Sequence, residues 1–239
     1  MTKLTGSSIR RLVSLLALGG ALVVTGQAGA QDNPRDPYEG FNRTMYSVNE
    51  ALDKYAARPV AQAYDAGVPL PVKASVGNFF GNVGELWIGA NSAMQGKPRD
   101  AGTGFARLFI NSTVGIFGLF DVASEMGLER FNEDFGQTLA VWGVNDGPYL
   151  FLPVIGPRTS RDLAGWAVDS FADPVSHISP ASVRLGTSVV RFVDIRAGLL
   201  PADKIIDEAA LDKYAYIRDA YLQRRNNLIH DGRPPRMDD

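Results

Sequence analysis

Residues that commonly carry catalysis are scarce in this chain, and the search for chemistry begins with its two histidines. His177 and His230 are far apart in the sequence, the first in a proline-bounded loop and the second in the exposed last turn of the final predicted helix. No H-E-x-x-H zinc motif, G-x-S-x-G elbow, P-loop or G-x-G-x-x-G loop is present. The sequence therefore contains no pattern that predicts an active site.

Adjacent carboxylates at Glu133 and Asp134 could in principle form an acid/base pair. Residues 134–137, however, read as a capping box, which favours a structural role for Asp134 at a helix start. The absence of cysteine excludes disulfides, thiolate metal sites and cysteine nucleophiles. We therefore expect a protein that is not an enzyme and that needs no metal or cofactor.

The first thirty residues read as a cleaved secretory signal peptide. Lys3, Arg10 and Arg11 form a positive segment, residues 12–24 are apolar, and residues 28–30 read Ala-Gly-Ala. The alternative is an uncleaved anchor, although 13 apolar residues are short for a membrane span. No later segment is long enough to span a bilayer as a helix, because the longest uncharged run, residues 108–120, also has 13 residues.

Without residues 1–30 the chain is acidic. Three of the 24 basic residues lie in that segment, so 21 basic residues face 26 acidic ones, a formal charge of −5. This balance argues against nucleic acid as a partner. We expect one domain over residues 31–230, followed by a polar, disordered tail at residues 231–239.

Helical periodicity dominates that domain, and we predict an all-α fold of about seven to nine amphipathic helices. Asp36 is expected to cap the first of them, and Thr159 opens a second capping box. A helix is predicted over residues 182–200, and the last is expected to start near Asp203 and continue to about Leu228.

Two helical segments have neutral or crowded apolar surfaces that suit either a buried core or a membrane interface. In residues 72–94 the face opposite the apolar stripe carries Gly, Asn and Ser in place of Lys and Glu, and residues 114–120 hold five large apolar side chains in seven positions. The residues predicted to contact a membrane are Phe79, Phe80, Trp87, Ile116, Phe117, Leu119 and Phe120.

The stretch GPYLFLPVIGP, residues 147–157, is uncharged and too rich in proline to be a helix. We expect it to form an extended, hairpin-like apolar arm; the alternative is a loop packed into the core. The arm residues proposed to line or gate a path are Gly147, Pro148, Tyr149, Leu150, Phe151, Leu152, Pro153, Val154, Ile155 and Gly156.

Four blocks carry a resemblance to a known family. They are DPYEGFNRTMYSVNEALDKYAARPVAQAY (36–64), FARLFINSTVGIFGLFDVA (105–123), DFGQTLAVWGVNDGPYLFLPVIGPRTSRD (134–162) and YIRDAYLQRRNNLI (216–229). In this order they resemble the MlaA family, also called VacJ, over residues 36–230.

The resemblance implies a ring-shaped helical protein in the inner leaflet of the outer membrane. Its central amphipathic channel would pass mislocalised outer-leaflet phospholipids to a periplasmic carrier, MlaC, and so maintain lipid asymmetry, in some members beside trimeric porins. This activity is not enzymatic. The alternatives are a porin-associated scaffold that moves no lipid and a phospholipase-like enzyme.

One feature departs from the family. Many members are anchored through a lipidated N-terminal cysteine, and this sequence contains no cysteine. We therefore expect outer-membrane association on the periplasmic side through embedded helices or a partner, with a soluble periplasmic protein as the alternative.

Overall fold

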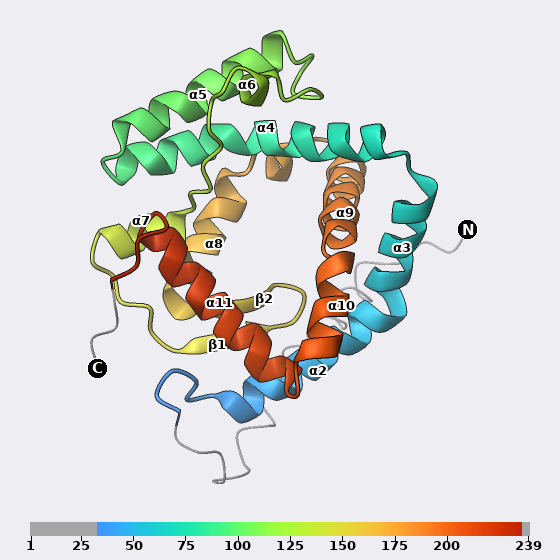
Figure 1. Cartoon of the computed structure of the whole chain (residues 1–239), viewed down its shortest axis with the longest axis vertical. Coiled ribbons are helices and arrows are strands. Elements are labelled where there is room, and N and C mark those ends of the chain that lie inside the picture. The colour runs from blue at the N-terminus through green and yellow to red at the C-terminus, as the bar shows by residue number, and fades with distance from the viewer. Residues whose placement is uncertain (1–32, 236–239) are drawn as a thin grey trace.

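The computed structural model describes residues 33–235. The predicted signal peptide and the last four residues of the predicted tail lie outside this part of the chain. The helices are arranged as a ring around a central space, with the long α4 along one side and α11 along another (Figure 1). The predicted all-α, ring-like architecture is confirmed.

The chain enters the ring through α2, a π-helical turn and α3, and then runs along α4 and α5. Later segments close the ring, and the sheet is a single two-stranded hairpin within the described residues. The bounds are α2 Glu39–Leu52, the π-helix Asp53–Ala57, α3 Arg58–Gly67, α4 Leu70–Met94, α5 Pro98–Thr113, α6 Val122–Glu125, α7 Phe135–Val141, β1 Tyr149–Leu152, β2 Gly156–Thr159, α8 Ser160–Ala172, the 3-10 helix Pro174–His177, α9 Ala181–Gly198, α10 Leu200–Ala209 and α11 Lys213–Ile229.

Small residues let α4 and α5 pack closely. A Cβ at Gly104 would lie 3.3 Å from the Cα of Gly89, and the ring of Phe105 covers Gly89. The Nε atom of Arg107 donates to Glu85 over 2.8 Å, and both side chains are almost completely buried. A glycine seam and a buried ion pair therefore hold these two helices together.

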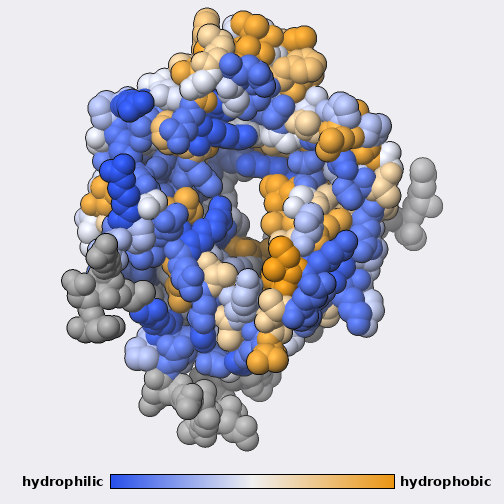
Figure 2. All heavy atoms as spheres, in the orientation of Figure 1, coloured by the Kyte–Doolittle hydropathy of each residue, from blue (hydrophilic) through white to orange (hydrophobic). Residues whose placement is uncertain are grey.

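The interior of this protein is unusually polar. Among the described residues, nine hydrophobic residues are buried, against 16 polar or charged ones. A wall about one helix thick, with open space on both sides, has no deep centre in which apolar side chains could gather. Many large apolar side chains are therefore exposed, as the hydrophobic atoms on the surface show (Figure 2).

Buried ion pairs connect the elements of this wall. Arg225 of α11 bonds to Asp134 at the start of α7 and to Asp162 of α8, the latter over 2.8 Å. Asp162 also accepts from the Tyr221 hydroxyl over 2.6 Å. One arginine thus joins three helices, and without it Asp134 would lose its cation while Asp162 would keep Arg161.

Two of the three predicted caps are confirmed. Asp134 accepts from the backbone N–H of Gln137, and Thr159 accepts from that of Asp162. The prediction for Asp36 is wrong, because α2 begins at Glu39 and has no side-chain cap. Asp36 is instead buried, where it accepts hydrogen bonds from Asn42 and Tyr214.

The single last helix expected from Asp203 to about Leu228 is also wrong, because the chain breaks it into α10 and α11. Ala210 is extended, with φ −96° and ψ 115°, and Asp212 caps α11 by accepting from the N–H of Ala215. The apolar stripe continues across the break, which is why periodicity alone did not reveal the corner.

Candidate functional site

An opening passes through the ring and has two unlike edges. Figure 2 shows hydrophobic atoms along the edge formed by α9 and α10, and mainly hydrophilic atoms along the opposite edge, near α8 and α11. Such an opening offers an apolar surface and a polar surface to the same molecule.

One stripe of exposed apolar side chains runs along α9 and ends beside α10. Its members in α9 are Leu185, Val189 and Phe192, and Leu199, between α9 and α10, continues the spacing, so the four lie along one face. Their exposed fractions are 66%, 51%, 47% and 52%. Arg196 occupies the remaining position of this stripe and brings a charge into it.

A cavity of about 400 Å³ lies where the hairpin meets α2, α9 and α10; we call it the hairpin cavity. Apolar side chains come from elements that include the hairpin, α9, α10 and α11, and charged ones from α2, the π-helix, α3, α9, α10 and α11. The apolar lining includes Phe151, Val154, Phe192, Leu199, Ile206 and Ile217. The volume and the mixed lining are typical of a ligand site.

The hairpin is the extended arm expected from the sequence. Its strands are antiparallel, and Tyr149 pairs with Thr159 and Leu152 with Gly156. Two asparagines of α2 hold its backbone: Asn42 bonds to the Tyr149 carbonyl and the Phe151 N–H, and Asn49 bonds to Leu152 and Val154 in the same way.

The ten arm residues divide between core and cavity. Tyr149 and Phe151 are buried against Tyr214. This face of β1 is therefore packed into the core, as in the alternative considered from the sequence. Phe151, Val154 and Gly156 line the hairpin cavity, and Val154 is 75% exposed at the turn. The other members are Gly147 and Pro153, which are exposed, and Pro148, Leu150, Leu152 and Ile155, which are half-buried.

Four charged groups close one end of the hairpin cavity. Arg196 donates to Asp53 over 2.6 and 2.8 Å and to Asp203 over 2.6 Å, and Arg58 donates to Asp53 over 3.1 Å. The hydrogen bonds from Arg196 lower the pKa of Asp53, although burial opposes them. The Nη1 atom of Arg196 is buried and has no acceptor among the described residues.

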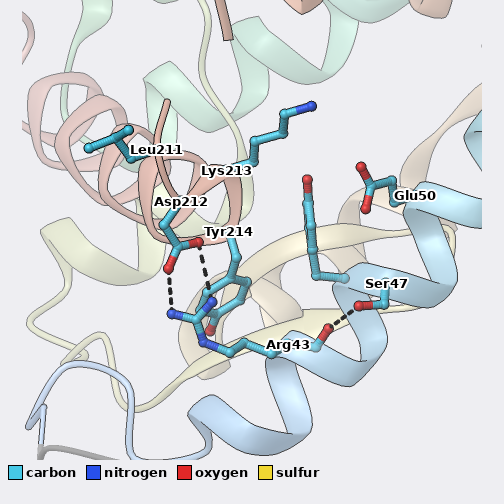
Figure 3. Close-up of a pocket in the computed structure, with 8 residues that line it drawn as sticks. Arg43, Ser47, Glu50, Leu211, Asp212, Lys213 and Tyr214 are labelled. Atoms are coloured by element: carbon cyan, nitrogen blue, oxygen red, sulfur yellow. Dashed lines mark hydrogen bonds and ion pairs between the residues drawn. The ribbon is translucent and has the colours of Figure 1, made fainter. Parts of the chain in front are cut away.

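A polar pocket of about 520 Å³ adjoins α2 and the start of α11 (Figure 3). Arg43 forms a two-point contact with Asp212, over 2.6 and 3.2 Å, and its hydrogen bond lowers the pKa of that carboxyl. Ser47 donates to the Arg43 carbonyl over 3.0 Å. Glu50 and Lys213 complete the charged lining.

The predicted membrane-contact residues fall into two groups. Ile116, Phe117, Leu119 and Phe120 are exposed, with Phe117 at 75%. Phe80 is buried, and Phe79 and Trp87 are half-buried.

Phe79, Phe80 and Trp87 contact neighbouring elements of the ring. The indole N–H of Trp87 donates to Asp169 over 2.6 Å. Phe79, Phe80 and Leu119 line a second, apolar cavity of about 460 Å³ between α4 and α9.

The backbone of the exposed group is strained. Ile116 and Phe117 have φ values of 52° and 56°, a region that a β-branched residue rarely adopts. Gly118 follows at φ 85°, where a Cβ would lie 2.5 Å from the Asn82 side chain. Together these residues form an exposed apolar loop, 114–120, whose conformation costs folding free energy, a cost that often marks a functional segment.

The side chains first considered for chemistry do not converge. His177 and His230 each bond to a backbone carbonyl, of Phe171 and Asn226 respectively, and Glu133 pairs with Lys97. The described residues hold no cluster of three or more His, Asp or Glu side chains suited to a metal ion. Over the same part of the chain, every helix is too short or too polar to cross a membrane.

Sequence reasoning missed the asparagines that hold the hairpin and the charged lining of both cavities. Asn42 and Asn49 stand seven residues apart on α2, which places them on one helix face. Asparagine is a poor residue for a helix interior, so this pair was a usable signal. The network of Asp53, Arg196 and Asp203 gave none, because Asp53 lies 143 positions from Arg196 in the sequence.

Comparisons with known proteins agree with one another. A family model described as MlaA lipoprotein matches residues 34–228. The intermembrane phospholipid transport system lipoprotein MlaA of Escherichia coli (strain K12) is 38% identical over 227 residues, covering 92% of this chain and 89% of that protein. The protein of the same name in Haemophilus influenzae is 32% identical, covering 92% and 91%.

A solved structure is also similar. It was described in work on the structural basis for maintenance of bacterial outer membrane lipid asymmetry, and it matches with a TM-score of 0.72 at 36% identity. The match covers 81% of this chain and 98% of that chain.

Proposed function

The chain belongs to the MlaA family, and on that basis we propose that it is a phospholipid channel of the outer membrane. Phospholipids that have reached the outer leaflet pass through the ring toward the periplasm, which maintains the lipid asymmetry of the membrane. The relatives' names and the subject of the similar structure support this function.

The observation that carries the proposal is the opening with one hydrophobic and one hydrophilic edge (Figure 2). A phospholipid has apolar chains and a polar head, and each part needs a matching surface to leave the bilayer without a large desolvation cost. The stripe on α9 suits the chains, and the polar edge near α8 and α11 suits the head.

The hairpin borders this path. Its turn residue Val154 lines one cavity together with Phe192 of α9 and Leu199 at the α9–α10 junction, so the position of the turn sets the width available there. The two asparagine clamps hold β1 against α2, which favours a fixed border over a freely swinging gate.

Membrane contact is assigned to the exposed apolar loop. Its large side chains are exposed after the C-terminal end of α5, and burying them in a lipid interface would recover free energy that exposure to water costs. The sequence contains no cysteine to carry a lipid, so these side chains and partner proteins provide the attachment. A periplasmic MlaC-like carrier receives the lipid, and a trimeric porin is a further candidate partner.

No reaction is proposed. His177 and His230 each bond to a backbone carbonyl, and the family relatives are named for transport. The competing functions are a porin-bound scaffold and a phospholipase. A phospholipase would hydrolyse labelled phospholipid, and a scaffold would leave lipid transport unchanged when the path is narrowed.

Deletion of the gene tests the proposal. We expect outer-leaflet phospholipid and detergent sensitivity to rise, and a copy of the wild-type gene to reverse both. An unchanged envelope in a strain without a second family member would refute the channel.

A further inference from the structure

The polar pocket and the hairpin cavity are neighbours. Tyr46, Glu50 and Lys213 line both of them, so these three side chains form their common border. Beyond that border the two linings differ. The pocket presents Arg43, Ser47 and Asp212, whereas the cavity presents mainly apolar side chains and the end of the α9 stripe.

The charges inside the pocket are not equally available. Arg43 and Asp212 satisfy each other, as the dashed lines in Figure 3 show. Glu50 has no hydrogen bond or ion pair with any described residue, and of the three N–H groups of Lys213 only one is used, by Asp207 over 2.5 Å. In Figure 3 the charged ends of Glu50 and Lys213 lie on the same side of the pocket, away from the Arg43–Asp212 pair.

A third available group lies deeper. The buried Nη1 atom of Arg196 has no acceptor among the described residues and belongs to a side chain that lines the hairpin cavity. A buried donor without a partner costs free energy, which an oxygen of a bound molecule would recover. The available groups are therefore a carboxylate and an ammonium at the border, and a guanidinium donor inside.

We propose that the two cavities form one station for an aminophospholipid, with the head-group amine on Glu50, the phosphate on Lys213 and an ester oxygen on Arg196. The station rests on the proposed function. It specifies where along the path the lipid binds and which class of head group binds there. The upper parts of the acyl chains lie against Phe192 and Leu199.

Charge complementarity selects this class of lipid. A primary ammonium donates hydrogen bonds to Glu50 while the phosphate accepts from Lys213, so both groups gain a partner. An anionic glycerol head has no cation to offer Glu50, and a choline head has no N–H to donate. The preference is modest because Glu50 is exposed to solvent.

The test measures which lipid the purified full-length protein retains. The protein is incubated in detergent with equal amounts of phosphatidylethanolamine and phosphatidylglycerol and re-isolated, and its bound lipids are extracted and quantified by mass spectrometry. We expect phosphatidylethanolamine to be enriched roughly two- to five-fold, the effect of one partly exposed charge contact. Glu50→Gln should abolish the enrichment, and Lys213→Gln should reduce the total lipid retained.

Glu129→Gln, an exposed carboxylate of the loop after α6, is the matched control and should retain the wild-type ratio. Equal retention of both lipids by the wild-type protein, or an enrichment that survives Glu50→Gln, would overturn the station while leaving the channel intact. A wild-type protein that retains no lipid of either kind would count against the channel itself.

Discussion

Asn42 and Asn49 hold the hairpin in the same manner, two turns apart on α2. Each side chain donates to a carbonyl of the hairpin and accepts from the N–H two residues later, at Tyr149 and Phe151 for Asn42 and at Leu152 and Val154 for Asn49. The amide groups thus take the place of a neighbouring strand. A hairpin of only two strands is marginally stable on its own. The bonds to the two asparagines explain how it stays ordered beside the path.

Replacing these asparagines should loosen the hairpin to different degrees. Asn42 is fully buried, so Asn42→Ala leaves buried backbone groups unpaired and should lower the free energy of unfolding by about 2–4 kcal/mol. Asn49→Ala should cost about 1 kcal/mol and speed hydrogen exchange at Val154. Ser47→Ala, on the exposed side of the same helix, is the control. Unchanged exchange at Val154 in Asn49→Ala would show that the clamp does not hold the turn.

Arg225→Met should be among the most destabilising single substitutions. It removes the cation of the half-buried Asp134 and leaves the buried Asp162 with Arg161 alone, so the free energy of unfolding should fall by about 3 kcal/mol. Arg224→Met changes the exposed neighbour and should alter stability by less than about 0.5 kcal/mol. Urea unfolding followed by circular dichroism measures both. Similar costs for the two variants would contradict the role given to the buried network.

Acid stability should depend measurably on Asp121. Burial alone would raise the pKa of this carboxyl, but hydrogen bonds from Ser124, Asn111 and Arg107 outweigh it and lower the pKa from 3.8 to about 2. A lowered pKa stabilises the fold above 3.8, and that contribution disappears as the pH falls toward 2. Between pH 4 and pH 2, the free energy of unfolding of Asp121→Asn should therefore fall by about 1 kcal/mol less than that of the wild-type protein. If urea titrations show that both proteins lose the same free energy of unfolding over this pH range, Asp121 does not have the lowered pKa.

The apolar loop should enter a bilayer interface. Because the chain has no cysteine, a single Phe117→Cys change gives one site for an environment-sensitive dye. On vesicles with outer-membrane inner-leaflet phospholipids its emission should shift to the blue. The same dye at Glu208→Cys on α10, an exposed position far from the loop, should not shift. Equal emission in water and with vesicles at position 117 would argue that the loop packs against protein.

Much of the fold followed from local signals. Asp134 and Thr159 cap helices at the positions that the sequence indicated. A capping box is a local signal, because it involves two residues only three positions apart. Pro153 and the flanking glycines likewise predicted an extended arm. Asp36 was misread because its local pattern fits a cap, whereas Tyr214 and Arg218, 178 and 182 positions away, hold it in the interior.

The candidate site was less accessible to sequence reasoning. The role of Val154 depends on facing Phe192 and Leu199 across a cavity, which only the ring closure creates. Charged residues such as Arg196 and Lys213 look like ordinary solvated helix residues in a sequence. Their availability to a ligand becomes visible only when the partners of every other charge nearby are known.

The central claim is that lipid passes beside the hairpin, and closing the hairpin cavity tests it most directly. Val154→Cys and Leu199→Cys would be joined by a short thiol cross-linker that a reductant reverses, in cells whose exposed phosphatidylethanolamine is labelled with an impermeant amine-reactive dye. We predict that cross-linked cells accumulate outer-leaflet lipid as deletion cells do and recover on reduction, whereas each single-cysteine variant stays like wild type. Normal outer-leaflet lipid with the cavity bridged would contradict the account.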